Sequence, residues 1–422
     1  MTRLLLTTKA VVAVAAFMAA AMVSAQATNQ TTEGLHSLFV ASGKLFFGTA
    51  TETNNFGDSA YQVIVNNKNE FGMFVPENSQ KWGPIEPTEG DFQFESPDSI
   101  VNRAEGNGQM FRCHALTWHS QLPAFVENGT WTRETLTSAI QTHIATVMGH
   151  YKGQCYSWDV VNEALNDNGT FRDSVFFRVL GTDFLPISFK AAEAADPTAK
   201  LYYNDFNLET IRNKTDAAVR IVELIRAAGA RIDGLGFQAH FRVGGTPSQA
   251  SLVATMNRFV DMGLEVALSE LDIAHNSLPA DSRALAQQST DYVAAVGACL
   301  AVPKCVGITL WQFTDKYSWI PSTFPGAGDA CLFSANFTKK PAYTAVKNLL
   351  TAVATGGGGG NGGNNSSAIQ SSGSPPAPVP GTGTLGGTND PATAALISGV
   401  SSISVVGSLL WPLAAGAIIS LL

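Results

Sequence analysis

Short apolar runs alternate with longer amphipathic stretches along the chain. The runs are LFFGTA from residue 45, EFGMFVPEN from 70, MFRCHALTW from 110, CYSWDVVNEA from 155, KLYYNDFN from 200, GLGFQAH from 234, EVALSELDI from 265 and CVGITLWQF from 305. Between them, residues 216–229 (DAAVRIVELIRAAG) place apolar residues at intervals of three and four and stop at a glycine, which is typical of an amphipathic helix.

Strands that alternate with covering helices form a parallel sheet that is buried on both faces. Eight such units in about 330 residues suit a closed (β/α)8 barrel, the TIM barrel of the α/β class. A doubly wound open sheet is the alternative, but no glycine-rich phosphate loop follows the first run. The pattern therefore favours the barrel.

The two ends of the chain differ in composition from its middle. Residues 1–25 contain Arg3 and Lys9, an apolar run and then Val23-Ser24-Ala25, which predicts a cleaved secretory signal peptide. Residues 355–390 are rich in Gly, Asn, Ser and Pro and predict a linker, because they cannot bury enough apolar surface to offset their ordering entropy. The folded domain is therefore expected over residues 26–354.

Residues 391–422 end in an uncharged apolar tail that follows small residues and a polar spacer. This order is typical of a glycolipid (GPI) anchor signal, with attachment expected within residues 386–389. A transmembrane helix is the alternative, since the run is long enough to cross a bilayer. No Lys or Arg follows it, however, so we expect a secreted protein tethered to the cell surface or wall, with a lipid anchor as its only membrane contact.

Net charge and cysteine content indicate which binding partners and which cellular compartment to expect. A net charge of −8 indicates no basic surface for phosphates, so nucleic acid is not an expected partner. Five cysteines in an exported chain indicate two disulfides and one remaining thiol. Cys299 and Cys305 are the preferred pair, Cys113 with Cys155 is the second, and Cys331 is then left free.

Polar residues that close the predicted strands should meet at one mouth of the barrel. They are Glu77, Asn78, Lys81, His114, Trp118, His119, Asn162, Glu163, Asn204, Asp205, Gln238, His240, Glu270, Asp272 and Trp311. Glu163 closes the fourth strand and Glu270 the seventh, so their carboxyl groups should face each other. Glycoside hydrolysis requires two carboxyl groups that flank the sugar linkage. Indole rings can cover the apolar face of a sugar while neighbouring amides bond its hydroxyl groups. The alternative is that each Glu only caps a strand.

Two other hydrolase classes are disfavoured. His114, His119 and His240 share the mouth with carboxylates, but there is no HExxH and no CxxC motif for a metal. A serine nucleophile elbow, GxSxG, is also missing. We therefore expect no metal and no cofactor.

Seven motifs resemble the family 10 glycoside hydrolases that act as endo-β-1,4-xylanases. They are ENSQKWGPIEPTEGDFQF, FRCHALTWHSQLP, WDVVNEAL, YYNDFN, GLGFQAHF, LSELDI and GITLWQFTDKYSW, and the resemblance runs from FGTAT at 47 to KKPAYTAV at 339. It implies retaining hydrolysis of xylan, with Glu163 as acid/base and Glu270 as nucleophile. Their carboxyl groups would lie about 5 to 5.5 Å apart, and repulsion from Glu270 would raise the pKa of Glu163.

The same resemblance implies that His240 and Asp272 orient the nucleophile and that Asn162 binds a sugar 2-hydroxyl. Residues implied to bind xylose units are Glu77, Asn78, Lys81, His114, Trp118, Gln121, Asn162, Gln238, His240, Trp311 and Trp319. Of these, Lys81 and Trp319 would crowd the hydroxymethyl group that distinguishes glucose from xylose. The sequence departs from the family at Phe206, Gln312 and Ile320, which puts product-side affinity in doubt.

The expected partners are xylan and xylo-oligosaccharides, and the expected state is a monomer. Two alternatives remain open at this point. One is a related barrel enzyme that prefers β-1,4-glucan. The other is a wall protein in which the barrel only binds polysaccharide.

Overall fold

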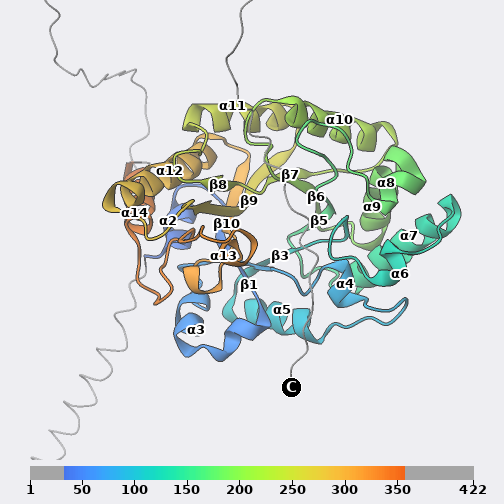
Figure 1. The fold of residues 1–422 in the computed structure, drawn as a ribbon, viewed down its shortest axis with the longest axis horizontal. Helices are drawn as coiled ribbons and strands as arrows, with labels where there is room; N and C mark the ends of the chain where they lie inside the picture. Colours follow the sequence, from blue (N-terminus) through green and yellow to red (C-terminus); the bar gives the residue numbers. More distant parts are fainter. Residues whose placement is uncertain (1–32, 357–422) are drawn as a thin grey trace, which may run out of the picture. The chain divides into compact units, whose positions relative to one another are not determined.

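The computed structural model describes residues 33–356 and shows a closed barrel of parallel strands surrounded by helices (Figure 1). The barrel strands are β1 Phe46–Thr51, β2 Met73–Pro76, β3 Met110–Cys113, β5 Ser157–Asn162, β6 Lys200–Asp205, β7 Gly234–Phe237, β9 Glu265–Ala274 and β10 Cys305–Leu310. Strand β10 pairs in parallel with both β9 and β1, which closes the ring. The predicted (β/α)8 fold is confirmed. The predicted signal peptide and tail lie outside the described residues, as does the predicted linker except for residues 355 and 356, which end helix α14.

Two short strands continue the sheet beyond the rim of the barrel. Strand β4, Thr117–Trp118, pairs with β5, and strand β8, His240–Arg242, pairs with β9. Their register sets Trp118 beside Asn162 and His240 beside Asp272. These extensions therefore fix the height at which several of the predicted site residues lie.

Helices fill the connections between the strands. The α-helices are α2 Leu35–Ala41, α3 Ser59–Val65, α4 Trp82–Ile85, α5 Glu95–Asn107, α6 Ala124–Glu127, α7 Arg133–His150, α8 Val175–Leu180, α9 Phe184–Ala195, α10 Asn213–Ala227, α11 Gln249–Val260, α12 Ser282–Ala301, α13 Ile320–Thr323 and α14 Pro341–Gly356. Short 3-10 helices are η1 Thr53–Gly57, η2 Gly181–Asp183 and η3 Asp315–Tyr317. None of the helices within residues 33–356 has the length and apolarity needed to cross a membrane.

Helix α10 forms where the spacing of apolar residues predicts it. Its buried stripe includes Ala218, Ile221, Val222 and Ile225, which recur at three- and four-residue intervals. The chain leaves the helix through Gly229, whose φ of 73° suits a residue without a side chain. The other face stays in solvent, so the helix covers the barrel with one side only.

The interior of the barrel is packed in layers. Phe46, Met73, Tyr202 and Ala267 form a buried apolar cluster near the amino ends of the strands. Nearer the mouth, polar side chains replace it, and Gly236 makes the room they need. A Cβ atom at Gly236 would lie 2.2 Å from the Oδ1 atom of Asn204. This polar layer is the floor of the predicted site.

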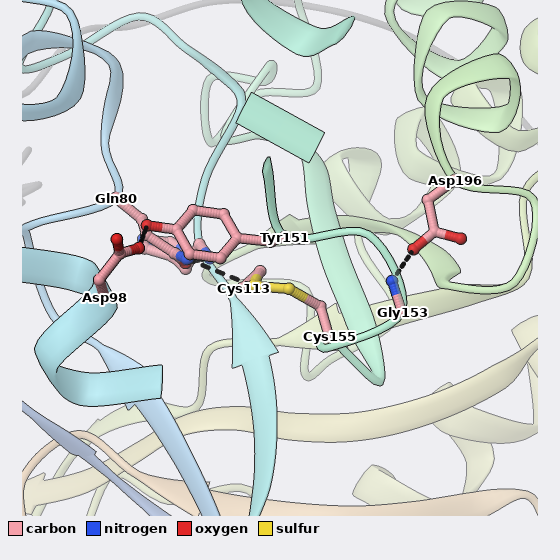
Figure 2. The surroundings of a disulfide bond; sticks show 8 residues. Gln80, Asp98, Cys113, Tyr151, Gly153, Cys155 and Asp196 are labelled. Atoms are coloured by element: carbon pink, nitrogen blue, oxygen red, sulfur yellow. Dashed lines mark hydrogen bonds between the residues drawn. A yellow bond between two sulfur atoms is a disulfide. The ribbon is translucent and has the colours of Figure 1, made fainter. Parts of the chain in front are cut away.

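Both expected disulfides are present. Cys299 pairs with Cys305 and so links α12 to β10, while Cys113 pairs with Cys155 and links β3 to the segment before β5. Figure 2 shows the second bond with Gln80 beside it, where the side-chain amide of Gln80 donates to Cys113 Sγ at 3.4 Å. Cys331 is free and buried.

Candidate active site

The two glutamates predicted from strand ends lie at the same mouth of the barrel. Glu163 follows β5 directly and accepts a hydrogen bond from Gln238 Nε2 at 3.0 Å. Glu270 lies within β9 and accepts one from Asn204 Nδ2 at 2.7 Å. The negative charges of both carboxylates act on the buried ammonium group of Lys81. The structure therefore brings both carboxyl groups around one cation.

Glu270 is held by a charged histidine. His240 Nε2 lies 3.1 Å from Glu270 Oε2, and His240 Nδ1 lies 3.0 Å from Asp272 Oδ1. Burial alone would lower the pKa of His240, but the adjacent Asp272 and Glu270 carboxylates raise it to about 10. Trp319 Nε1 donates to the other oxygen of Asp272 at 2.8 Å. An imidazolium cation thus faces the Glu270 carboxylate and is itself fixed by Asp272.

Glu163 has a different electrostatic environment. Burial raises its pKa, but His119, the Gln238 and Trp118 hydrogen bonds and the Arg172 guanidinium together bring the pKa below its usual value. Desolvation lowers the pKa of His119 to about 4. The expectation that the pKa of Glu163 is raised is therefore wrong, because His119, the hydrogen-bond donors and Arg172 together outweigh the effect of burial.

A cluster of polar side chains from the β2 and β4 ends lies on one side of the carboxylates. Lys81 Nζ donates to Asn78 Oδ1 at 3.0 Å and lies 4.7 Å from the centre of the Trp118 ring. Gln121 Nε2 donates to the same Asn78 oxygen at 3.3 Å. Burial lowers the pKa of Lys81, although four carboxylates around it favour its charge.

Glu77 belongs to the same cluster and has an unusual pKa. Burial raises it to about 7, against the opposing effects of the Gln312 hydrogen bond and the Lys81 charge. Gln312 Nε2 donates to Glu77 Oε2 at 3.0 Å. The carboxyl group of Glu77 therefore changes between acceptor and donor near neutral pH, as hydroxyl recognition allows.

Aromatic rings form a second wall of the mouth. The rings of His114 and Trp311 lie 5.4 Å apart, and those of His240 and Trp319 lie 5.0 Å apart. Trp311 packs against Ala50 and is only 6% exposed. The rings of His240 and Trp311 lie 6.4 Å apart, which joins the two pairs. Asn162 lies on strand β5, between β4 and β6.

Several supporting residues were not predicted. Glu52 Oε1 accepts the backbone N–H groups of Asn78 and Ser79 at 2.6 and 2.9 Å. The Nδ1 atom of His114 lies 2.9 Å from Asp159 Oδ2. The Asp159 carboxylate also pairs with the fully buried Arg112. One signal was available, because a charged residue inside an apolar strand run must find a partner.

The backbone is strained at the mouth. Gln121, Glu163, Ala239 and Gln312 have φ values of 50°, 54°, 59° and 76°, and each follows a strand or its extension. Residues with side chains adopt this left-handed region at a cost, and such residues concentrate at functional sites. The strain turns the chain sharply after each strand, which is what brings the Glu163 side chain back over the barrel.

Metal ligation has no counterpart in the described part of the chain. Across residues 33–356 no group of three or more His, Cys, Asp or Glu side chains is arranged to hold a metal ion. The arrangement instead combines one carboxylate held by an imidazolium with a second carboxyl group that accepts a hydrogen bond from a neutral amide. That combination suits nucleophilic attack by the first group and proton transfer by the second.

Comparison with known proteins agrees with this geometry. Endo-1,4-beta-xylanase 5 of Pyricularia oryzae is 60% identical over 322 residues, which cover 76% of this chain and 80% of that protein. Endo-1,4-beta-xylanase 1 of Humicola insolens is 52% identical over 337 residues, covering 80% of this chain and 77% of the relative.

Solved structures give the same result. The crystal structure of a GH10 xylanase from Bispora sp. MEY-1 with xylobiose superimposes with a TM-score of 0.73 at 39% identity, covering 75% of this chain and 99% of that one. The sequence model of glycosyl hydrolase family 10 matches residues 34–349. With the barrel, the two carboxylates and this match in agreement, the chain belongs to glycosyl hydrolase family 10.

Proposed function

We propose that this chain is an endo-1,4-β-xylanase that hydrolyses xylan by a double displacement with retention at the anomeric carbon. The observation that carries the mechanism is the unequal environment of the two carboxyl groups. Glu270 lies against the His240 imidazolium, at 3.1 Å, whereas Glu163 accepts a hydrogen bond from the neutral Gln238 amide. The xylanases to which the chain is similar support the substrate class.

In the first step, a Glu270 oxygen attacks the anomeric carbon and the bond from that carbon to the leaving oxygen breaks. Glu163 gives its proton to the leaving oxygen, and a covalent xylosyl ester of Glu270 remains. In the second step, a water molecule attacks the same carbon while Glu163 takes up a proton from it. The ester bond breaks, and both carboxyl groups return to their starting states.

The first step requires Glu163 to carry a proton, although the groups around it hold its pKa below the usual value. A bound sugar removes water from around the carboxyl group, and desolvation raises the pKa of a carboxylic acid. At neutral pH His119 is uncharged, because desolvation lowers its pKa to about 4. We therefore infer that Glu163 takes up its proton together with the substrate.

We assign sugar recognition to the polar cluster around Lys81 and Asn78 and to the aromatic rings at the mouth of the barrel. Asn162 would bind the 2-hydroxyl beside the reacting carbon, and Lys81 and Trp319 would exclude a hydroxymethyl group. The hydrogen bond from Trp319 to Asp272 and the contact of Lys81 with Asn78 support this, since both side chains are held in place. A pocket wall of this kind selects xylose over glucose by crowding.

The domain arrangement and location are part of the proposal. A secreted domain over residues 26–354, joined by a linker to a glycolipid anchor, fits the two disulfides of the folded part. We also propose that the protein is a monomer.

The test is the configuration of the first product released from xylopentaose, followed by NMR. The β-anomer should appear first and then equilibrate, and an α-anomer as the first product would refute the roles of Glu163 and Glu270. Two variants with added azide serve as matched controls. Glu270→Ala should form the α-xylosyl azide by one displacement, whereas Glu163→Ala should form the β-azide through the ester intermediate.

A further inference from the structure

Arg172 lies next to the acid/base residue although it is nine positions further along the chain. Residues 165 and 171 form an antiparallel bridge, and the backbone N–H of Arg172 donates to the Ala164 carbonyl at 2.9 Å. The segment between them leaves the barrel and returns, so that Arg172 re-enters beside Glu163. Its guanidinium carbon lies 5.3 Å from the centre of the Phe206 ring.

The Arg172 side chain lacks the ion-pair partners that the neighbouring Lys214 has. Within residues 33–356 it forms no ion pair and no side-chain hydrogen bond, and its Nε atom is buried without a partner. The adjacent cation Lys214 is different, because it lies 3.0 Å from Asp205 and 3.3 Å from Asp167. A buried donor without a partner is costly, and such a group in a cleft is commonly satisfied by a ligand.

Arg172 lies on the leaving-group side of the cleft. Its charge acts on Glu163 and on His119, whereas the groups that contact Glu270 are His240 and Asn204. The leaving oxygen must reach the Glu163 carboxyl group in the proposed mechanism. A cation beyond Glu163 therefore faces the sugars that leave first.

We propose that the Arg172 guanidinium binds the carboxylate of a uronic acid branch on the leaving-group portion of xylan. The inference rests on the proposed function. The xylose backbone is neutral and offers no full charge to a guanidinium, whereas a uronate offers a planar carboxylate that matches its two-pronged donor geometry.

The experiment compares glucuronoxylan with the same polysaccharide after its carboxyl groups have been reduced to alcohols. The pair differs in charge and not in branching, so the ratio of the two kcat/KM values measures recognition of the carboxylate. In the wild type this ratio should exceed one. It should fall about fivefold in Arg172→Met, the upper end for a solvent-accessible ion pair, and Arg172→Lys should keep part of it.

Salt supplies a second measurement, because screening weakens an ion pair that water can reach. The wild-type ratio should drop toward the Arg172→Met value in 0.5 M NaCl, about the range in which the screening length becomes a few ångströms, while the variant ratio should stay constant. Arg226→Met is the matched control. That exposed arginine lies at the end of α10 and donates only to the Met262 carbonyl, so its ratio should equal the wild-type ratio.

The outcomes separate the two proposals. An unchanged ratio in Arg172→Met, or an equal loss on both substrates, means that Arg172 only packs against Phe206, and it overturns this inference while the xylanase stands. If the wild type cleaves neither polysaccharide, the proposed function fails and the inference fails with it.

Discussion

His240 shows how one residue sets the charge of the site. Its two nitrogens lie 3.1 Å from Glu270 and 3.0 Å from Asp272, and these carboxylates keep the imidazole protonated. A neutral imidazole would leave two buried carboxylates close together without the cation that lies between them, which is unfavourable in a low-dielectric interior. The charge state of His240 is therefore as much a part of the nucleophile as the Glu270 side chain.

This charge predicts a pH dependence of stability. The pKa of His240 is raised from 6.5 to about 10 in the folded state, so its stabilising contribution is complete below pH 6.5 and is lost as the pH rises toward 10. The difference in free energy of unfolding between wild type and His240→Gln should therefore shrink between pH 6 and pH 10, by on the order of 3 kcal/mol. Denaturant titrations at each pH measure it, and a constant difference would mean that His240 is neutral.

Single residues were predictable where a motif or a strand end marks them. Glu163 and Glu270 follow apolar runs, and the position of each was clear without coordinates. The lowered pKa of Glu163 was not, because it depends on His119 and Arg172, which reach the carboxyl group from other segments. Electrostatic environment is a property of three-dimensional neighbours, so the sequence supplied the chemical groups and not their ionisation.

At the scale of elements, the strand ends are positioned by what packs inside the barrel. Asn204 on β6 donates to Glu270 on β9 at 2.7 Å, across the position where β7 contributes Gly236. Ser269 Oγ donates to the Oδ1 atom of Asn204 at 2.6 Å, which fixes the amide. A missing side chain on β7 thus allows two other strands to make contact.

Gly236→Ala should therefore impair catalysis more than folding. The new Cβ would lie 2.2 Å from Asn204 Oδ1 and 3.0 Å from Ser269 Oγ, so Asn204 must move and release Glu270. We expect kcat/KM to fall about 100-fold, as displacements of about 1 Å in a catalytic group commonly cause. Gly106→Ala on α5 meets no atom within 4 Å and should leave activity unchanged. Equal activity of the two variants would contradict the role of Asn204.

The eight barrel strands were predictable from the apolar runs, and each lies within its run except β1 and β9, each of which extends one residue past the end of its run. The extensions β4 and β8 were not separated from β3 and β7, because the break comes from the backbone and not from a change in hydrophobicity. The pair Arg112 and Asp159 was also missed, since pairing between β3 and β5 depends on the register of neighbouring strands. Pattern therefore determines which segments become strands, and register determines which polar groups meet.

At the scale of the whole molecule, the two disulfides constrain very different lengths of chain. The bond between Cys299 and Cys305 spans 6 positions, and the bond between Cys113 and Cys155 spans 42. A crosslink stabilises mainly by restricting the unfolded chain, and the effect grows with the length of the closed loop. The longer loop also contains the whole of α7, and its first residue after Cys113 is His114.

Removal of each bond should show this difference. Replacement of Cys113 and Cys155 by Ala should lower the free energy of unfolding by about 4 kcal/mol, and the same change at Cys299 and Cys305 by about 2 kcal/mol. Thermal unfolding of both double variants under identical conditions measures the order. A larger loss from the short loop would show that local packing around α12 and β10, and not chain entropy, dominates.

The free thiol of Cys331 can be used to measure local opening of the structure. It is buried, and burial raises its pKa well above the usual value, so it hardly reacts while the loop around it stays closed. That loop is tied to η3 through the bond from the Cys331 backbone N–H to Asp315, and η3 leads directly to Trp319. The rate at which an alkylating reagent labels Cys331 thus reports how often the segment beside Trp319 opens. Local opening at the mouth of the barrel is therefore measurable without an introduced cysteine.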